Sequence, residues 1–256
     1  MSESQIVYVF NVYKQTVNDL HELVIPTDRV DLTGGESLID YSCVSSCGTV
    51  RAFFRDLEAR LIEQIEAADY VYGCVAWLTS EPILEALASK RGVQIVVQKE
   101  DFLRPDGKDG SAWARRLRAL YDALDNPIDR YHVAGRANFM SFCGDPSIEA
   151  VRCVGNHNAA KNPAFPRSHH KFVLFGKIEI DDEDPDYPHR YVRPYAVWTG
   201  SFNFTKNAGR SFENAVLLTD PFVVAAFEQE WSQILALSEP LDWSSSWVAP
   251  QWRIGS

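Results

Sequence analysis

Residues 70–98 decide the fold; they read YVYGCVAWLTSEPILEALASKRGVQIVVQ. The nearly continuous apolar run at 70–78 is typical of a strand that is covered on both faces of its sheet. Ser80 is the expected N-cap of a helix over residues 81–90. A second buried strand follows at 93–98. The quoted stretch therefore predicts a strand, a helix and a second strand in the same sheet.

The segments around this unit continue the alternation of helices and strands. Apolar residues recur at helical spacing over residues 50–67, which predicts an amphipathic helix before the first buried strand. Downstream we expect a basic amphipathic helix at 111–125, strands at 151–154, 171–175, 195–198 and 215–218, and a closing helix at 221–237. Alternating helices and strands favour right-handed crossovers. We therefore predict an α/β fold with a mixed, mostly parallel β-sheet flanked by helices.

One domain accounts for most of the chain. Its 256 residues, 46% of them apolar, suffice for a large core and exclude a mainly disordered chain. We expect a strand and an irregular extension at 1–49, the domain at 50–240 with an acidic insertion at 177–194, and a tail at 241–256. The net charge of -10 has the wrong sign for coating nucleic acid, but six of the acids lie between residues 179 and 186.

The cysteines and the N-terminal sequence indicate the cellular compartment of the protein. Five cysteines are an odd number in a chain too large to need disulfides, which fits a reducing compartment. Cys43 and Cys47 would suit half of a zinc site, but no second pair follows at zinc-finger spacing. The sequence has no secretion signal at its start and no apolar run of the ~20 residues that a membrane helix needs. We expect a cytoplasmic protein without membrane insertion.

Polar side chains gather at two expected strand ends, RSHHKFVLF at 167–175 and TGSFNFT at 199–205. Because side chains alternate along a strand, His169 and Lys171 share one face, and so do Ser201 and Asn203. An imidazole, an ammonium, a hydroxyl and a carboxamide that converge suit a tetrahedral anion such as phosphate. An imidazole titrates near pH ~6.5, so it can attack phosphorus when neutral or donate a proton when charged.

A third segment, SFENAV at 211–216, places a carboxylate at the head of a strand. Glu213 is a candidate to hold the far nitrogen of His169 and fix its tautomer. Arg167 and Thr199 are candidates for substrate binding together with Lys171 and Asn203. We assign no residue to a metal or to a cofactor.

This pattern resembles the phospholipase D superfamily, whose signature is His-x-Lys, four residues, Asp, and then Gly-Ser-x-Asn. The chain has His169-His-Lys171 and Gly200-Ser-Phe-Asn203, and its segment 211–214 matches one in the small single-motif nucleases of that superfamily. The resemblance covers roughly residues 50–237 and implies a phospholipase D-like fold.

The chain departs from this signature in two ways. Gly176 stands where the signature has Asp, and the acidic insertion lengthens the usual short hairpin. The Asp is mainly structural in the superfamily, so we expect activity to survive. Asp181 and Asp182 are the nearby acids that would substitute for it. The insertion itself fits a solvated hairpin tip, or a gate that repels phosphate beside the site.

The resemblance also implies a metal-independent mechanism that uses two histidines. The chain has one His-x-Lys copy, so we expect a homodimer with the active site on its two-fold axis. His169 would attack phosphorus, and the same residue of the second subunit would act as acid and then base. Lys171 and Asn203 would stabilise the phosphate oxygens. Ser201 would add a hydrogen bond, and Glu213 would orient His169.

Nucleic acid is the substrate that the nuclease-like segment favours, which makes the chain an endonuclease acting on DNA or RNA. Local cations that would contact its phosphates are Arg104, Arg115, Arg116, Arg118, Lys161 and Arg167, although the three in 111–125 fit a solvated helix face equally well. The alternatives are a phospholipase D-type lipid hydrolase and a catalytically impaired protein that binds nucleic acid or acts as a scaffold. Because the protein is acidic, we expect a larger complex to bring it to its nucleic acid substrate.

Overall fold

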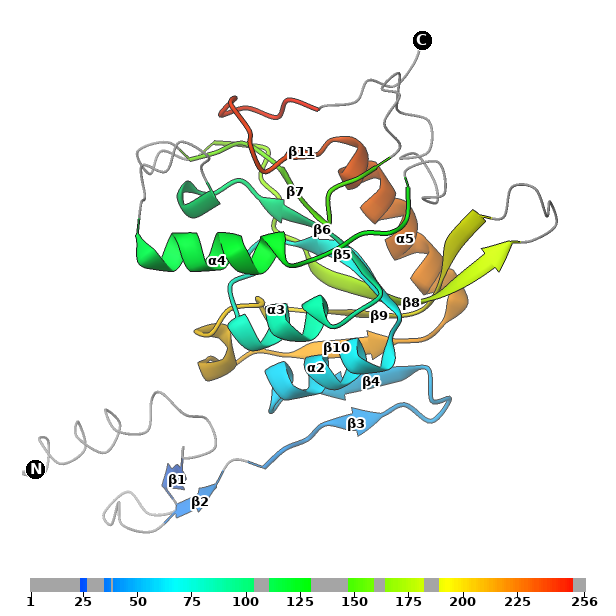
Figure 1. Cartoon of the computed structure of the whole chain (residues 1–256). Helices are drawn as coiled ribbons and strands as arrows, with labels where there is room; N and C mark the ends of the chain where they lie inside the picture. Colours follow the sequence, from blue (N-terminus) through cyan, green and yellow to red (C-terminus); the bar gives the residue numbers. More distant parts are fainter. Residues whose placement is uncertain are drawn as a thin grey trace, which may run out of the picture.

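The computed structural model describes residues 24–26, 35–37, 39–103, 111–129, 147–158, 164–181 and 189–250. Most of them build one nine-stranded sheet with helices on both faces, shown in Figure 1. A separate two-stranded sheet joins β1 (Val24–Pro26) to β2 (Gly35–Ser37). The strand expected in the N-terminal segment 1–49 begins with the apolar stretch 6–12, which lies outside the described residues, as do Arg104, Cys143, Lys161 and Asp182.

The strands of the large sheet are β3 (Cys43–Val44), β4 (Val50–Phe53), β5 (Tyr70–Val75), β6 (Gly92–Gln98), β7 (Val151–Val154), β8 (Lys171–Asp181), β9 (His189–Gly200), β10 (Ala215–Leu218) and β11 (Glu239–Pro240). Their order across the sheet is β11-β7-β6-β5-β8-β9-β10-β4-β3. β5 and β6, which the opening stretch predicts, lie side by side and parallel, and both are buried along their whole length.

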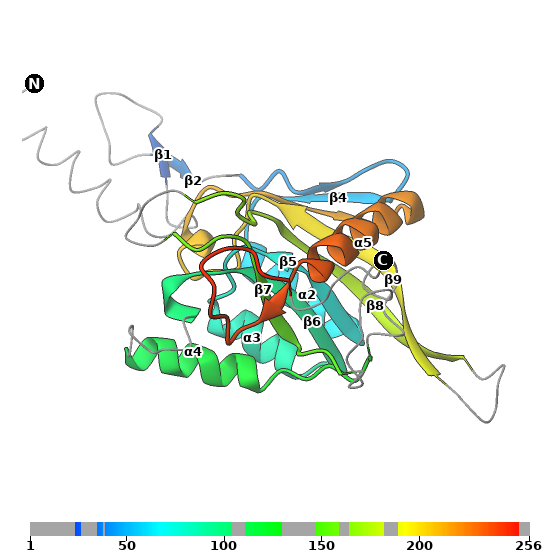
Figure 2. The ribbon, with the colours of Figure 1, turned by 90° about the horizontal axis from the view of Figure 1, so that it is seen from above.

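Helices cover the two faces of this sheet unequally. One face carries α2 (Leu57–Ala67), α3 (Glu81–Ala88) and α4 (Ala112–Asp122), and the other carries α5 (Pro221–Ala236), as Figures 1 and 2 show. Two short 3₁₀ turns, η1 (Asp101–Leu103) and η5 (Ala208–Arg210), lie in the connections. Each face of the sheet packs its own apolar core against its helices. The hydroxyl of Ser80 caps α3 by accepting from the amide of Ile83, as expected.

The prediction of a mixed sheet flanked by helices is confirmed, but the expectation that it is mostly parallel is wrong. In the described sheet β6 pairs in parallel with β5 and with β7, and every other neighbouring pair is antiparallel. The connections from β8 to β9 and from β9 to β10 carry no α-helix in the described residues, and a parallel neighbour needs such a crossover. Among the described elements, helix and strand alternate from α2 to β6, and β8, β9 and β10 then follow one another without an α-helix between them.

The helix expected over 50–67 begins later than predicted. Residues 50–53 form β4, which pairs with β10 on one side and with β3 on the other. The ring of Phe53 stacks on Trp198 of β9, with 5.2 Å between the ring centroids. Pairing and burial within the sheet therefore override the helical spacing of the apolar residues here.

The expected acidic insertion at 177–194 is in large part a regular two-stranded arm. A β-bulge between Phe175 and Gly176 marks the place where β8 and β9 leave the sheet, because β5 pairs with β8 only as far as Gly176. Beyond it Lys177 lies opposite Arg193, and the pairing continues to the end of β8. Figures 1 and 2 show this arm, drawn in yellow-green, projecting from the body of the domain.

The arm leaves the sheet at the end of β8 that is opposite to Lys171. Asp181 is ten residues further along the strand, or about 33 Å at ~3.3 Å per residue. The idea that this insertion gates the site is therefore wrong within one chain, since its described strands lead away from Lys171. Asp181 also lies five residues beyond Gly176 on β8, about 17 Å at ~3.3 Å per residue, so it does not occupy the position of the signature Asp.

The C-terminal residues pack on the domain after β11. Trp243 is buried in the core on the α2 face. The ammonium of Lys99, itself fully buried, forms an ion pair with Glu239 and donates to the carbonyls of Ser245 at 3.0 Å and Trp247 at 2.8 Å. These contacts fix the residues after 240 across the ends of β6 and β7.

None of the helices in the described part of the chain has the length and apolar character needed to span a membrane.

Candidate active site

The candidate site lies at the edge of the sheet where β8 begins and β9 ends. Phe172 of β8 pairs with Thr199 of β9, so the residues just before Phe172 and just after Thr199 meet at the same edge. The half-buried Thr199 is itself part of this pairing. β5 ends at the same edge, because Val75 pairs with Lys171. The sheet therefore brings together the two segments that the sequence singled out.

His169 and Lys171 are in direct contact. The ammonium of Lys171 lies 3.2 Å from Nδ1 and 3.3 Å from Nε2 of His169, and it donates to the carbonyl of His169 at 3.0 Å. His169 is exposed, whereas Lys171 is 9% exposed. His170 points to the other face, where it lies 3.6 Å from Glu230 of α5. The predicted alternation of side chains is confirmed at these three positions.

An aromatic and ionic network surrounds His169, and the sequence reading missed it. The ring of Trp77 lies edge-on to His169, with 5.3 Å between centroids, and the ammonium of Lys171 is 5.8 Å from the same indole. Trp77 donates through Nε1 to Glu100 at 3.0 Å, and Glu100 also forms an ion pair with Arg167. Trp77 and Glu100 each lie two residues after the end of a buried strand, and this position was the signal available.

Burial and neighbouring cations change the acidity of the central pair. Burial and then the charges of Lys171, Arg167 and His170 lower the pKa of His169, which favours the neutral imidazole. Burial also lowers the pKa of Lys171, and the carboxylate of Glu213 opposes this shift. Glu213 therefore lies close enough to Lys171 to act on it electrostatically.

Glu213 accepts its hydrogen bond from Ser201 rather than from His169. The hydroxyl of Ser201 donates to Glu213 and accepts from the amide of Asn214 at 3.0 Å. Gly200 permits this close approach, because a Cβ at position 200 would lie 2.3 Å from the carbonyl oxygen of Asn214. The expected role of Glu213 in orienting His169 is therefore not seen within one chain; in this chain Lys171 and Trp77 contact the imidazole.

Asn203 and Arg167 both retain unused hydrogen-bonding capacity. The Oδ1 atom of Asn203 is buried and has no hydrogen-bond partner among the described residues. The same holds for one terminal nitrogen of Arg167, whose guanidinium is paired with Glu100 through the other. Of these two buried atoms, Oδ1 of Asn203 can only accept a hydrogen bond, whereas the guanidinium nitrogen of Arg167 can donate one to an anion.

Two buried side chains hold the loop that leads into His169. Gln98 accepts from the amide of Ser168 at 2.7 Å and donates to the carbonyl of Asn156 at 2.9 Å. Asn156 donates to the carbonyl of Phe165 at 2.6 Å, and it also receives a 2.7 Å bond from the amide of Val248. Val248 thus shares a support with the loop that leads into His169.

Gly176, which replaces the signature Asp, has no room for a side chain. A Cβ there would lie 2.4 Å from Cγ1 of Val192 on the arm. The carbonyl of Gly176 accepts from the amide of Asp69 at 3.1 Å. The arm therefore occupies the space that an Asp at this position would need.

Two of the cations that were expected to contact phosphates are paired with acidic side chains of the protein instead. On α4, Arg116 forms an ion pair with Glu81 and Arg118 forms one with Asp242 at 3.0 Å. These two side chains fit the solvated, internally paired helix face that the sequence also allowed.

The described residues contain no group of three or more His, Cys, Asp or Glu side chains placed to hold a metal ion. Cys43 and Cys47 are exposed free thiols at the edge of the sheet, so the zinc site considered for them has no further ligand in this part of the chain.

Comparison with known proteins places the chain beside a viral relative. No family model matches the chain. The uncharacterized protein L381 of Acanthamoeba polyphaga mimivirus is 30% identical over 222 residues, a match that covers 80% of this chain and 72% of L381. The chain belongs to the same family as L381.

Two solved structures are similar to most of the domain. NucT from Helicobacter pylori is 16% identical with a TM-score of 0.45, and the match covers 73% of this chain and 94% of NucT. Nuc from Salmonella typhimurium, a phospholipase D family member, is 16% identical with a TM-score of 0.43 and covers 74% of this chain and 95% of its own.

Proposed function

We propose that this protein is a metal-independent phosphodiesterase of the phospholipase D superfamily, an endonuclease that cleaves DNA or RNA. The observation that carries the proposal is the contact between His169 and Lys171 at the edge where Ser201 and Glu213 also meet. This arrangement sets an imidazole nucleophile beside a cation that binds a phosphate oxygen. Asn203 follows Ser201 at the same strand end, and its amide Nδ2 is the atom that would donate to a phosphate oxygen.

His169 is the nucleophile of the proposed reaction. Its lowered pKa keeps a lone pair on the imidazole at neutral pH. The ring nitrogen forms a bond to phosphorus while the bond from phosphorus to the leaving oxygen breaks. Lys171 and Asn203 bind the non-bridging oxygens as negative charge develops on them. Ser201 adds a hydrogen bond, and Glu213 holds its hydroxyl in place.

A second imidazole handles the protons. In the proposed homodimer the two His169 side chains share one proton: the neutral one is the nucleophile, and the partner subunit's His169 starts as the imidazolium and gives its proton to the leaving oxygen. It then takes a proton from a water molecule whose oxygen attacks phosphorus, and the bond from phosphorus to the first His169 breaks. Both histidines end in their starting states, and the site lies on the two-fold axis.

The experiment is a substrate panel with two adjacent histidine variants. Wild type, His169→Ala and His170→Ala are incubated with single-stranded DNA, duplex DNA, RNA, phosphatidylcholine and bis(p-nitrophenyl) phosphate, with and without EDTA. We expect EDTA-resistant cleavage of nucleic acid by wild type and by His170→Ala, because His170 points to the other face. Loss of at least ~100-fold is expected for His169→Ala, since the nucleophile is gone.

Other outcomes of the panel overturn parts of the proposal. Full cleavage by His169→Ala would refute the assignment of His169 as the nucleophile. Turnover of phosphatidylcholine alone would show that the protein is a lipid hydrolase. No turnover of any substrate leaves the binding or scaffold alternative. Light scattering at assay concentration tests the dimer, because an active monomer has no second His169.

A further inference from the structure

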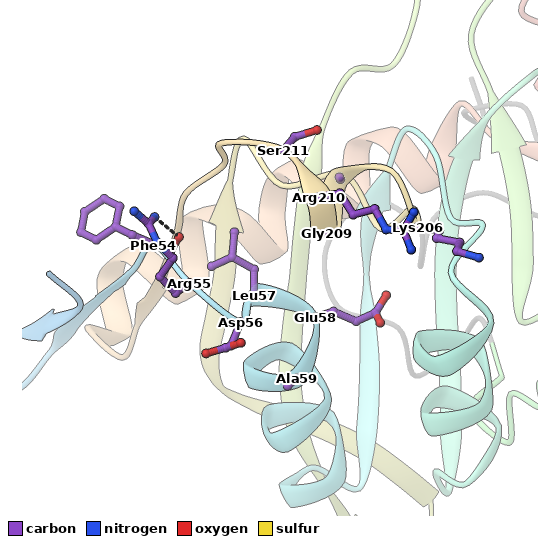
Figure 3. Close-up of a pocket in the computed structure, with 11 residues that line it drawn as sticks. Phe54, Arg55, Asp56, Leu57, Glu58, Ala59, Lys206, Gly209, Arg210 and Ser211 are labelled. Carbon is purple, nitrogen blue, oxygen red and sulfur yellow. Dashed lines mark hydrogen bonds between the residues drawn. The ribbon is translucent and has the colours of Figure 1, made fainter. Parts of the chain in front are cut away.

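Two hollows adjoin the candidate site and together form what we call the side groove. The first, of about 360 Å³, lies between the start of α2 and the η5 turn, and Figure 3 shows its lining. The second, of about 570 Å³, lies at the start of α3 beneath Trp113 of α4. Glu58 and Lys206 line both hollows, so the two lie side by side.

Three chain segments connect the candidate site to the side groove; they are 77–79, 203–206 and 211–213. Each has a residue of the site at one end and a residue that lines the groove at the other. The first two segments are bonded together, because the amide of Thr79 donates to the carbonyl of Phe204 at 2.8 Å. The candidate site and the groove therefore lie only two or three residues apart along each of these segments.

The groove offers cations that the described residues do not neutralise. Lys206 and Arg210 are exposed and form no ion pair within the described part of the chain, and Figure 3 shows both at the same side of the hollow as Glu58. Glu81 is paired with Arg116, and Glu58 accepts a 2.6 Å hydrogen bond from the hydroxyl at the start of α3. The lining also includes one further cation and one further acid, Arg55 and Asp56.

Trp113 supplies an aromatic surface at the far end of the groove. Its indole packs edge-on against Phe102, with 5.3 Å between centroids, and remains 45% exposed. A fixed, half-exposed indole beside free cations is the combination that binds single strands, because bases stack on the ring while cations contact the phosphates. A base within a duplex has no free face to offer.

We propose that the side groove binds the strand that continues from the bond being cut, and that this strand is single-stranded nucleic acid. Lys206 and Arg210 contact phosphates next to the scissile one, and Trp113 stacks on an unpaired base. The proposal rests on the proposed function, since it extends the path of the same substrate.

The test measures binding by proteins that also carry His169→Ala, so that no strand is cut. The variants are Lys206→Gln/Arg210→Gln and Trp113→Ala. The matched control is Lys90→Gln/Arg91→Gln, which removes the same two positive charges. These residues precede the first residue of β6, whereas the candidate site lies beyond its last. The probe is a 20-nucleotide strand, as DNA and as RNA, and its duplex, over a series of salt concentrations.

We expect the Lys206/Arg210 variant to bind the single strand about 10-fold more weakly than the control, with a salt slope smaller by about 1.4. Trp113→Ala should weaken single-strand binding about 5- to 150-fold and leave duplex binding unchanged. In the background with an intact His169, cleavage of bis(p-nitrophenyl) phosphate should not change, because that probe is too short to reach the groove.

Equal binding by the groove variants and the control would overturn the proposal. Equal loss of duplex and single-strand binding in Trp113→Ala would overturn the single-strand part of it. If wild type cleaves no phosphodiester, the proposed function fails, while the binding comparison still decides whether the groove holds a single strand.

Discussion

Replacing Lys99 with Met should destabilise the protein strongly, although Lys99 takes no part in the proposed reaction. Its ammonium is fully buried and has the Glu239 carboxylate and the carbonyls of Ser245 and Trp247 as partners. The change leaves Glu239, whose side chain is 8% exposed, without its counter-ion. Breaking one partner of a buried pair costs about 3–5 kcal/mol. At about 2–4 °C per kcal/mol, the melting temperature should fall by about 6–20 °C.

Thermal unfolding followed by circular dichroism measures the melting temperature of Lys99→Met, and two further variants serve as controls. Arg193→Met breaks an ion pair on the exposed arm and should cost about 0–1 kcal/mol. Lys99→Met/Glu239→Met removes both buried charges and should recover most of the lost stability. The reasoning is refuted if Lys99→Met lowers the melting temperature no more than Arg193→Met does. Hydrogen exchange should also rise in residues 241–250 of Lys99→Met, because their anchor is lost.

Three further perturbations test the site and the arm. Lys171→Met should raise the pKa of His169 in an NMR titration, because burial and then the charge of Lys171 hold it below its usual value; an unchanged or lower pKa would contradict this. Gly200→Ala should cost about 1–3 kcal/mol in urea unfolding and reduce nuclease activity, since its Cβ would press on Asn214; wild-type stability would speak against this packing. Shortening the arm at 178–192 should leave cleavage of bis(p-nitrophenyl) phosphate unchanged, and a large loss would connect the arm to the site.

The candidate site was predictable because its residue types alternate along short strands. The alternation placed His169 and Lys171 on one face and His170 on the other, and both placements hold in the structure. Trp77 and Glu100 were not predictable from composition, since a tryptophan and a glutamate after buried strands have many uses. Their role depends on two parallel strands ending beside the start of β8, which no local pattern encodes.

The sequence by itself determined the α/β class, the buried pair β5 and β6, and the identity of the polar residues at the strand ends. These follow from periodicity and capping, which act over a few neighbouring residues. Only the tertiary structure decided that most strands pair antiparallel, that the acidic insertion is an arm at the far end of β8, and that Glu213 bonds to Ser201. Strand order and register arise from packing between residues far apart in the chain, so the energy that selects them is absent from any short stretch.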